Sequence, residues 1–184
     1  MADARIRDGQ GLRLAAAAPA GLVVLRVRAD DAETRLALAA ALGTALPLSP
    51  AQPTGIAGAR LFWTSPDALL LDLDASADVA STVERLAAAL SGRHAAVHDV
   101  TDARTWFTIG GPHARAVLAK GTGIDLDPRA LPPGAAALTR FAGLTVLLAH
   151  RDDGARYELL ADRAVEDWLW AWLLDAGDEY AVAR

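Results

Sequence analysis

The chain has 184 residues, of which 53% are hydrophobic and 22% charged, so it is long and apolar enough for one domain or two small ones and is not expected to be disordered. Its net charge is −5 at pH 7, and its scattered cations are nearly all arginine, so no clustered basic face for nucleic acid is expected. It contains no cysteine, which excludes disulfides, thiolate zinc sites, thiol nucleophiles and iron–sulfur ligation. No stretch approaches the ~18 apolar residues of a membrane span, so we expect a cytoplasmic protein without a membrane partner.

The first half of the chain predicts a compact unit after a loose start. Residues 1–20 lack periodicity and are expected to form a flexible N-terminal arm. The predicted elements are then a strand at 22–28, a helix at 32–42 capped by Asp30 or Asp31, a hairpin at 56–63 and 68–73, an amphipathic helix at 79–90 ended by Gly92, and a strand at 95–100. This β-α-β-β-α-β order is the ferredoxin-like pattern, which we assign to a lobe at 21–101.

The second half predicts another α+β lobe, at 102–184. A strand at 104–109 leads into a short helix that starts at Pro112, with an apolar stripe of Ala114, Val117 and Leu118, and Gly121 is expected to end it in a left-handed turn. Strands follow at 137–141, 144–150 and 155–160, and a terminal helix at 163–174. The predicted fold class is therefore α+β, with two small ferredoxin-like lobes made of antiparallel sheets with helices on one face.

The four histidines predict no metal site. On a strand, the spacing of His94 and His98 puts their Cα atoms roughly 13 Å apart, too far for one ion. His113 lies in the first turn of the predicted helix, where a cation is unfavourable, so a neutral surface imidazole is expected. His150 lies beside Arg151 and Asp152 at a strand end and is expected to be solvated.

Motifs for nucleotide binding and nucleophilic catalysis are missing from the sequence. Gly121-Thr122-Gly123 is the nearest approach to a dinucleotide fingerprint, but it follows a helix and lacks the third glycine. No serine lies in a Gly-x-Ser-x-Gly turn. We therefore assign no catalytic, cofactor-binding or metal-binding residue to this chain, and expect it to bind neither flavin nor NAD alone.

Asp99, Asp102 and Arg104 form a possible constellation between two predicted strands. Carboxylates at this position could bind an amine or a pterin. The alternative is an Asx-type turn with Arg104 pairing locally, which we favour.

The tryptophans of the last helix suggest a contact with another protein. Val165, Trp168, Leu169, Trp172 and Leu173 share one face at ~100° per residue, which predicts the core stripe. Trp170 points away from this stripe, with Leu174 one turn beyond it. A second apolar spot that contains tryptophan is a candidate partner interface, although the N-terminal arm or loops could cover it instead. Trp63, at the tip of the predicted hairpin, is a weaker candidate of the same kind.

Several stretches resemble the gamma subunit of heterotetrameric sarcosine oxidase, a small member of the folate-binding aminomethyltransferase superfamily. They span roughly residues 60–176 and keep the order found in that family. They are Trp63-Thr64-Ser65-Pro66-Asp67 with Leu69-Leu70-Leu71, Val100 to Thr105, Gly111 to Gly121, Asp125 to Arg129, Leu131 to Gly134, Tyr157 to Leu160 and Trp168 to Leu174. The first 20 residues match little, and Thr101 stands where the family pattern has serine.

The resemblance implies aminomethyltransferase-like lobes and a supporting role without a catalytic residue. The enzyme of that family oxidatively demethylates sarcosine to glycine, hydrogen peroxide and a one-carbon unit passed to tetrahydrofolate. Alpha and beta subunits carry NAD, FAD, covalent FMN and the folate site, and a delta subunit carries zinc. Two alternatives stay open: a gamma-type subunit of a related secondary-amine oxidizing complex such as N-methylglutamate dehydrogenase, and a stand-alone folate-binding module.

Overall fold

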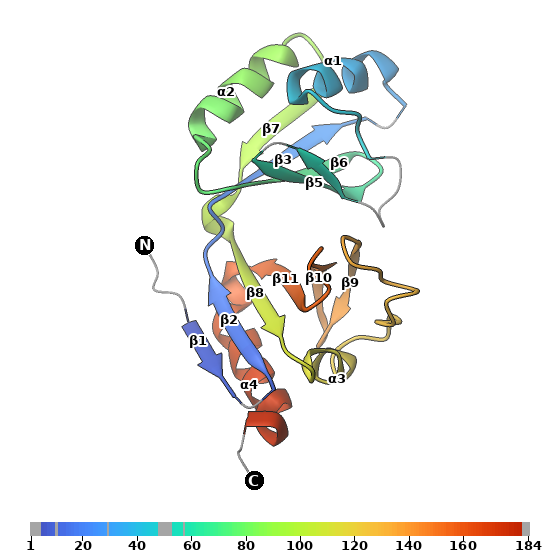
Figure 1. Cartoon of the computed structure of the whole chain (residues 1–184). Helices are drawn as coiled ribbons and strands as arrows, with labels where there is room; N and C mark the ends of the chain where they lie inside the picture. Colours follow the sequence, from blue (N-terminus) through green and yellow to red (C-terminus); the bar gives the residue numbers. More distant parts are fainter. Residues whose placement is uncertain (1–4, 10, 29, 48–52, 57, 182–184) are drawn as a thin grey trace. The chain divides into compact units, whose positions relative to one another are not determined.

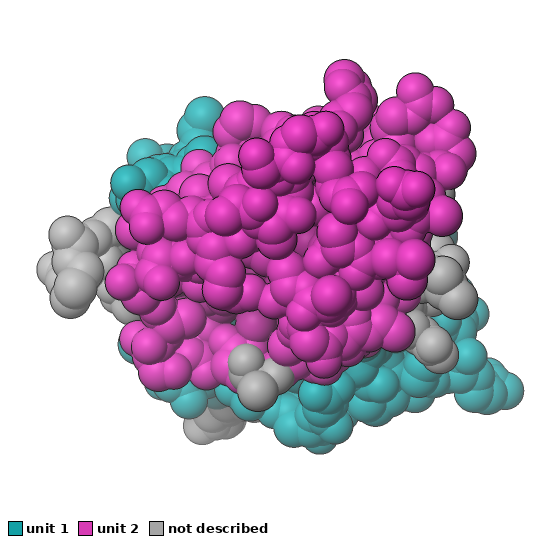
Figure 2. All heavy atoms as spheres, turned by 90° about the horizontal axis from the view of Figure 1, so that it is seen from above, with its two compact units in different colours: residues 1–18, 102–184 teal, residues 19–101 magenta. Residues whose placement is uncertain are grey.

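The computed structural model describes residues 5–9, 11–28, 30–47, 53–56 and 58–181. The chain divides into two compact units, distinguished by colour in Figure 2. One unit consists of residues 19–101, and the other combines residues 1–18 with residues 102–184.

The 19–101 unit has the ferredoxin-like topology that the sequence predicts. Its elements are β3 (Gly21–Val27), α1 (Ala32–Leu42), β4 (Thr54–Ile56), β5 (Ala59–Ser65), β6 (Ala68–Leu73), α2 (Val79–Ala89) and β7 (Ala95–Asp99). The antiparallel sheet has the order β4-β5-β6-β3-β7, in which the four strands of the pattern stand as second, third, first, fourth. Both helices lie over the same face of this sheet (Figure 1).

Residues close in the sequence set the ends of the helices in this unit. Asp31, one of the two predicted caps, accepts a hydrogen bond from the backbone N–H of Thr34 at 2.9 Å and so satisfies an unpaired donor of the first turn of α1. Asp30 instead pairs with Arg28. Gly43 ends α1 in the left-handed conformation. Leu38 and Leu86 then project from the two helices onto the leucines of β5 and β6.

The second unit has a six-stranded antiparallel sheet with its own strand order. Its elements are β1 (Arg5–Asp8), β2 (Arg13–Ala17), β8 (Arg104–Gly110), α3 (Ala114–Ala119), β9 (Ala136–Phe141), β10 (Leu144–His150), β11 (Arg156–Asp162) and α4 (Glu166–Ala181). The order is β1-β2-β8-β11-β10-β9. Strands β9, β10 and β11 follow one another as a meander, unlike the crossed order of the other sheet.

The prediction of a flexible N-terminal arm is wrong for the described residues. Strands β1 and β2 form a hairpin, and β2 pairs along β8, from Arg13 opposite Gly110 to Ala17 opposite Trp106. The alternation of Leu12, Leu14 and Ala16 places these three side chains in the core. The hairpin is therefore an integral part of the 102–184 lobe, and the predicted boundary at residue 20 does not separate an arm.

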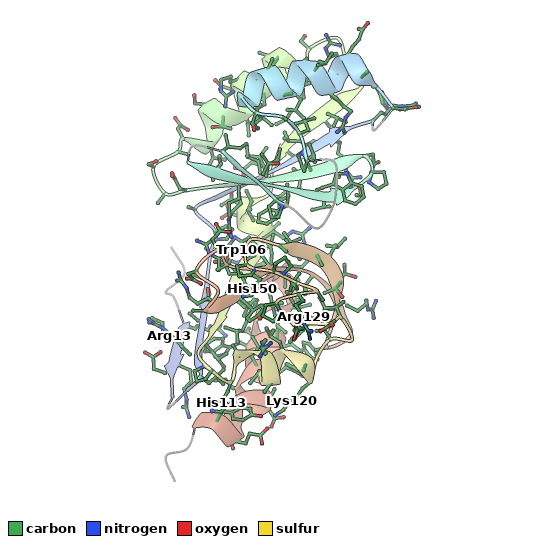
Figure 3. The ribbon with its side chains drawn as sticks, turned by 45° about the vertical axis from the view of Figure 1, so that its right-hand side comes forward. Arg13, Trp106, His113, Lys120, Arg129 and His150 are labelled. Carbon is green, nitrogen blue, oxygen red and sulfur yellow. The ribbon has the colours of Figure 1, made fainter. Side chains whose placement is uncertain are left out.

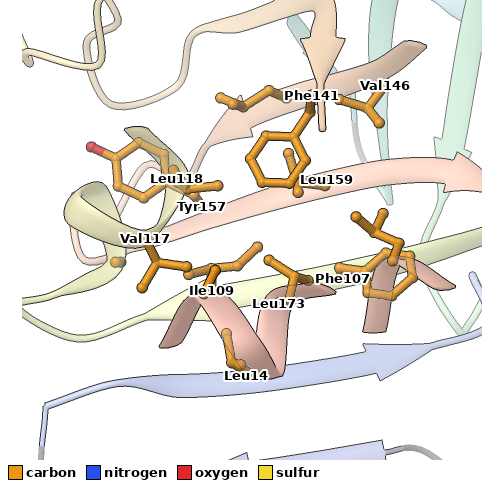
Figure 4. Packing of buried hydrophobic residues seen from close by; sticks show 14 of the residues in the cluster. Leu14, Phe107, Ile109, Val117, Leu118, Phe141, Val146, Tyr157, Leu159 and Leu173 are labelled. Carbon is orange, nitrogen blue, oxygen red and sulfur yellow. The ribbon is translucent and has the colours of Figure 1, made fainter. Parts of the chain in front are cut away.

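One core fills the space between this sheet and its two helices (Figure 4). Phe107 and Ile109 of β8, Leu14 of β2 and Leu159 of β11 face Leu173 of α4. The apolar stripe predicted for α3 is buried in the same cluster. Both helices thus cover one face of the sheet, as predicted for both lobes.

Two helices differ from the prediction at their ends. Helix α3 begins at Ala114 with His113 as its N-cap, so Pro112 lies outside it, and Gly121 does not have the left-handed conformation expected of it. A Cβ at Gly121 would lie 2.7 Å from the Phe141 ring, so this glycine permits a close approach. Helix α4 continues past Leu174 to Ala181. None of the helices in the described ranges is long and apolar enough to cross a membrane.

Candidate functional site

Helix α4 carries the tryptophans of the candidate interface and is fixed along its whole length. Near its start, Glu166 accepts a hydrogen bond from the Thr105 hydroxyl of β8 at 2.7 Å. In its middle, Leu169 and Leu173 are fully buried. Near its end, Gly177 lets β2 come close, because a Cβ there would lie 2.5 Å from Leu12. Hydrogen bonding and packing thus hold α4 near its start, in its middle and near its end.

Lys120, the one lysine of the sequence, holds the C-terminal end of α4. Its ammonium donates hydrogen bonds to the Ala176 carbonyl at 2.6 Å and to the Glu179 carboxylate. A cation is favourable here because the last carbonyls of a helix carry partial negative charge. The hydrogen bond with Glu179 raises the pKa of Lys120 and lowers the pKa of Glu179. Sequence reasoning did not identify this contact, although a lone lysine among arginines is a visible signal.

His113 lies at the same end of the helix. Its ring stacks on Tyr180, with centroids 4.4 Å apart and an interplanar angle of 11°, so the imidazole is half-buried and not the free surface group that was expected. Figure 3 shows His113 and Lys120 at this end of the unit. The segment from His113 to Lys120 therefore clamps the final turns of α4.

The structure places the tryptophans of α4 differently from the prediction. Trp168, predicted for the core, is 49% exposed. Trp170 and Leu174, predicted to point away from the core, are half-buried and pack against it. Trp172 is also half-buried and meets Phe141 edge to face at 5.0 Å. The buried face of α4 is therefore rotated about the helix axis, away from the predicted stripe and toward Gly177.

The candidate residues of the interface retain some accessible surface. Leu174 borders a hollow of about 360 Å³ whose apolar lining also includes Leu12 and Leu14, and whose rim carries Arg7 and Asp178. In the other unit, Trp63 is half-buried against the core. A partner interface at Trp170, Leu174 and Trp63 remains a prediction.

His150 is buried, not solvated as predicted, with 2% of its surface exposed. Its Nδ1 lies 2.8 Å from the Leu131 carbonyl oxygen, and its ring stacks on Tyr157 at 4.3 Å. Its Nε2 has no hydrogen-bond partner among the described residues. Burial raises the pKa of the Tyr157 hydroxyl. The loop that packs over this histidine could not be foreseen from its polar sequence neighbours.

In the constellation of Asp99, Asp102 and Arg104, the first and last residues have structural partners. Asp99 accepts hydrogen bonds from the backbone N–H and the hydroxyl of Thr101, at 2.9 and 2.6 Å, which is the Asx-type turn. Arg104 pairs with Asp162 on the neighbouring strand at 2.7 Å. The turn that we favoured is confirmed, whereas the pairing of Arg104 is not local.

The remaining titratable groups form no reactive cluster in the part of the chain that the structure describes. His94 precedes β7 and His98 lies within it, and both are exposed. The described ranges contain no group of three His, Cys, Asp or Glu side chains that could hold a metal ion. A shallow hollow of about 290 Å³ is lined by Arg26, Arg28 and Arg93, but each of these arginines pairs with a carboxylate.

The fold defines the class of protein. Over 97% of its length, the chain superposes on 47% of the glycine cleavage system aminomethyltransferase T from Bartonella henselae with a TM-score of 0.62 and 18% sequence identity. At this identity the similarity shows the fold alone, an aminomethyltransferase-like α+β fold.

The family follows from closer similarities. Residues 26–179 match the family described as sarcosine oxidase, gamma subunit. A sarcosine oxidase subunit gamma from Arthrobacter sp is 35% identical over 179 residues, which cover 91% of this chain and 86% of that protein. A chain of the heterotetrameric sarcosine oxidase from Corynebacterium sp. U-96 has a TM-score of 0.86 and 28% identity, covering 97% of this chain and 90% of that chain. This chain belongs to the sarcosine oxidase gamma subunit family.

Proposed function

We propose that this chain is the gamma subunit of a heterotetrameric sarcosine oxidase. The observation that carries the proposal is the superposition on a chain of such a tetramer, which includes 97% of this chain. The curated gamma subunits that resemble it match along most of their own length, up to 86%. That correspondence includes both units of the fold rather than a single shared lobe.

The chain supports the complex and supplies no catalytic group to it. Among the described residues, the polar side chains with the best geometry serve the fold: Lys120 holds the end of α4, Thr105 holds its start, and Asp99 closes a turn. The reaction of the complex is the oxidative demethylation of sarcosine to glycine, hydrogen peroxide and a one-carbon unit on tetrahydrofolate.

The cofactors belong to the partners in this proposal. The alpha and beta subunits hold NAD, FAD, FMN and tetrahydrofolate, and the delta subunit holds zinc. The assembly works in the cytoplasm, without nucleic acid or membrane as partners. The acidic net charge of −5 and the lack of cysteine are compatible with these assignments.

The test is co-expression of this chain with the alpha, beta and delta subunits from its own organism. We expect a stable four-subunit complex that contains flavin and produces hydrogen peroxide from sarcosine. The chain purified alone should have no flavin absorbance, no amine oxidation and no saturable folate binding at micromolar concentration. A complex that prefers N-methylglutamate, or micromolar folate binding by the lone chain, would refute the proposal in favour of one of the two alternatives.

A further inference from the structure

The outward face of α4 combines an exposed tryptophan with carboxylates. At about 100° per residue, this face covers about a third of the helix circumference, opposite Leu169 and Leu173. It consists of Asp167, Trp168, Ala171, Asp175, Asp178 and Glu179, all of which are exposed. We call these six residues the Trp168 face. It has no basic residue of its own and has one small residue, Ala171, near its centre.

Two of the four carboxylates on this face are already paired. Asp167 is 2.5 Å from Arg5 of β1, and Glu179 pairs with Lys120. Asp175 and Asp178 form no ion pair within the ranges that the structure describes. Two carboxylates therefore remain outside the ion pairs of this face, and both follow Ala171 toward the C-terminal end of α4.

Trp168 is the exposed end of an aromatic row. Trp172 lies one turn further on the same edge of the helix, and its ring meets Phe141 in the core. A partner side chain that covers Trp168 would thus lie on the same edge of the helix as the packed Trp172 ring. The indole also belongs to a helix held at its start by Thr105 and at its end by Lys120, so little conformational freedom is lost on binding.

We propose that the Trp168 face docks an arginine-bearing segment of a partner subunit. One guanidinium can stack on the exposed indole, and a second basic side chain of the same segment can reach Asp175, about 10 Å further along the helix. An acidic or purely aliphatic segment would leave Asp175 and Asp178 unmatched. Tryptophan and arginine are also the residue types that most often dominate the binding energy of interfaces. The inference rests on the proposed function, because it assigns a surface of this chain to the assembly of that complex.

The test measures how fast the chain leaves the assembled complex. The four subunits are co-expressed, and exchange of the bound chain for a labelled wild-type copy is followed over time. We expect Trp168→Ala to accelerate exchange by about 30-fold, the factor for loss of an anchor residue at an interface. The double variant Asp175→Asn and Asp178→Asn should slow association on the order of threefold at low ionic strength, and this difference should vanish in high salt.

Matched controls separate the face from general surface effects. Leu36→Ala removes another exposed apolar helical side chain, 71% exposed on α1, and should leave exchange unchanged. Glu84→Gln removes an exposed carboxylate of α2 that has no ion pair among the described residues, and should not alter association. All variants should keep the wild-type melting temperature, because the altered side chains are exposed.

The outcomes distinguish this inference from the proposed function. Failure of the wild-type chain to enter a complex would refute the proposed function. A complex that forms and exchanges at the wild-type rate with Trp168→Ala would refute the docking surface alone. Concentration-dependent dimers of the lone chain that disappear in Trp168→Ala would also overturn the inference, since a second copy would then be the occupant.

Discussion

Replacing Gly121 by alanine should destabilise the 102–184 lobe, although such a change usually stabilises a protein. The backbone at Gly121 is outside the left-handed region, so alanine should gain about 0.4–1 kcal/mol by restricting the unfolded chain. The added Cβ, however, would lie 2.7 Å from the Phe141 ring and 2.8 Å from Trp172. These are rigid rings, one fully buried, and overpacking of this kind costs about 1–3 kcal/mol. The net expectation is a loss of about 1–2 kcal/mol.

Thermal and urea unfolding followed by tryptophan fluorescence measure this loss. For a unit of this size, about 1 kcal/mol corresponds to roughly 4–8 °C in melting temperature. Gly123→Ala is the matched control, because its Cβ would meet nothing within 4 Å and its backbone is likewise outside the left-handed region. The control should be neutral or slightly stabilising.

A double-mutant cycle locates the cause. In a Phe141→Leu background, the smaller side chain should relieve part of the overlap, so Gly121→Ala should cost less there than in the wild type. A Gly121→Ala variant as stable as Gly123→Ala would show that the rings move aside freely. The account of Gly121 as a close-approach glycine would then be wrong.

Three further predictions concern stability. Because the pKa of Glu179 is lowered from 4.5, its stabilisation is present above pH 4.5 and lost as the pH falls through the lowered value, so melting temperature against pH should fall more in the wild type than in Glu179→Gln. The raised pKa of Lys120 makes the matching loss occur at high pH, above 10.5. Thr105→Val should cost about 1–2 kcal/mol in urea unfolding by leaving the half-buried Glu166 without its donor. Leu86→Ala should cost about 2–5 kcal/mol by opening a cavity beneath α2.

The ferredoxin-like unit could be predicted because its signals are local. The cap at Asp31, the glycine at Gly43 and the turn before Ala68 each lie within a few residues of the boundary that they set. The strand order then follows from the β-α-β-β-α-β pattern. One departure occurs at Gly58, where a positive φ of 72° divides the predicted first hairpin strand into β4 and β5.

The N-terminal strands were missed because the strand that joins their hairpin to the sheet, β8, lies far along the chain. Leu12, Leu14 and Ala16 do alternate, which is a signal of a half-buried strand. The signal is weak within a run of alanines. Strand β2 pairs with β1 on one side, but its partner on the other side is β8, about ninety residues later. No residue near position 14 indicates that this segment would pair with β8.

The orientation of α4 depends on the same distant contact. Counting only large apolar residues placed the core stripe on Trp168 and Trp172. The structure turns the helix toward Ala176 and Gly177, because these small residues allow β2 to pack closely through Leu12. Hydrophobicity along the helix cannot predict this rotation, since the decisive partner is not on the helix.

The position of Trp168 at the surface therefore follows from how the N-terminal hairpin packs. Leu12 contacts the glycine face of α4, and Arg5 of the same hairpin pairs with Asp167 beside Trp168. Trp168 lies on the side of α4 opposite Gly177 and is 49% exposed. A segment that looks like a loose arm in the sequence thus determines which side of α4 is available to a partner, and the candidate interface depends on both ends of the chain.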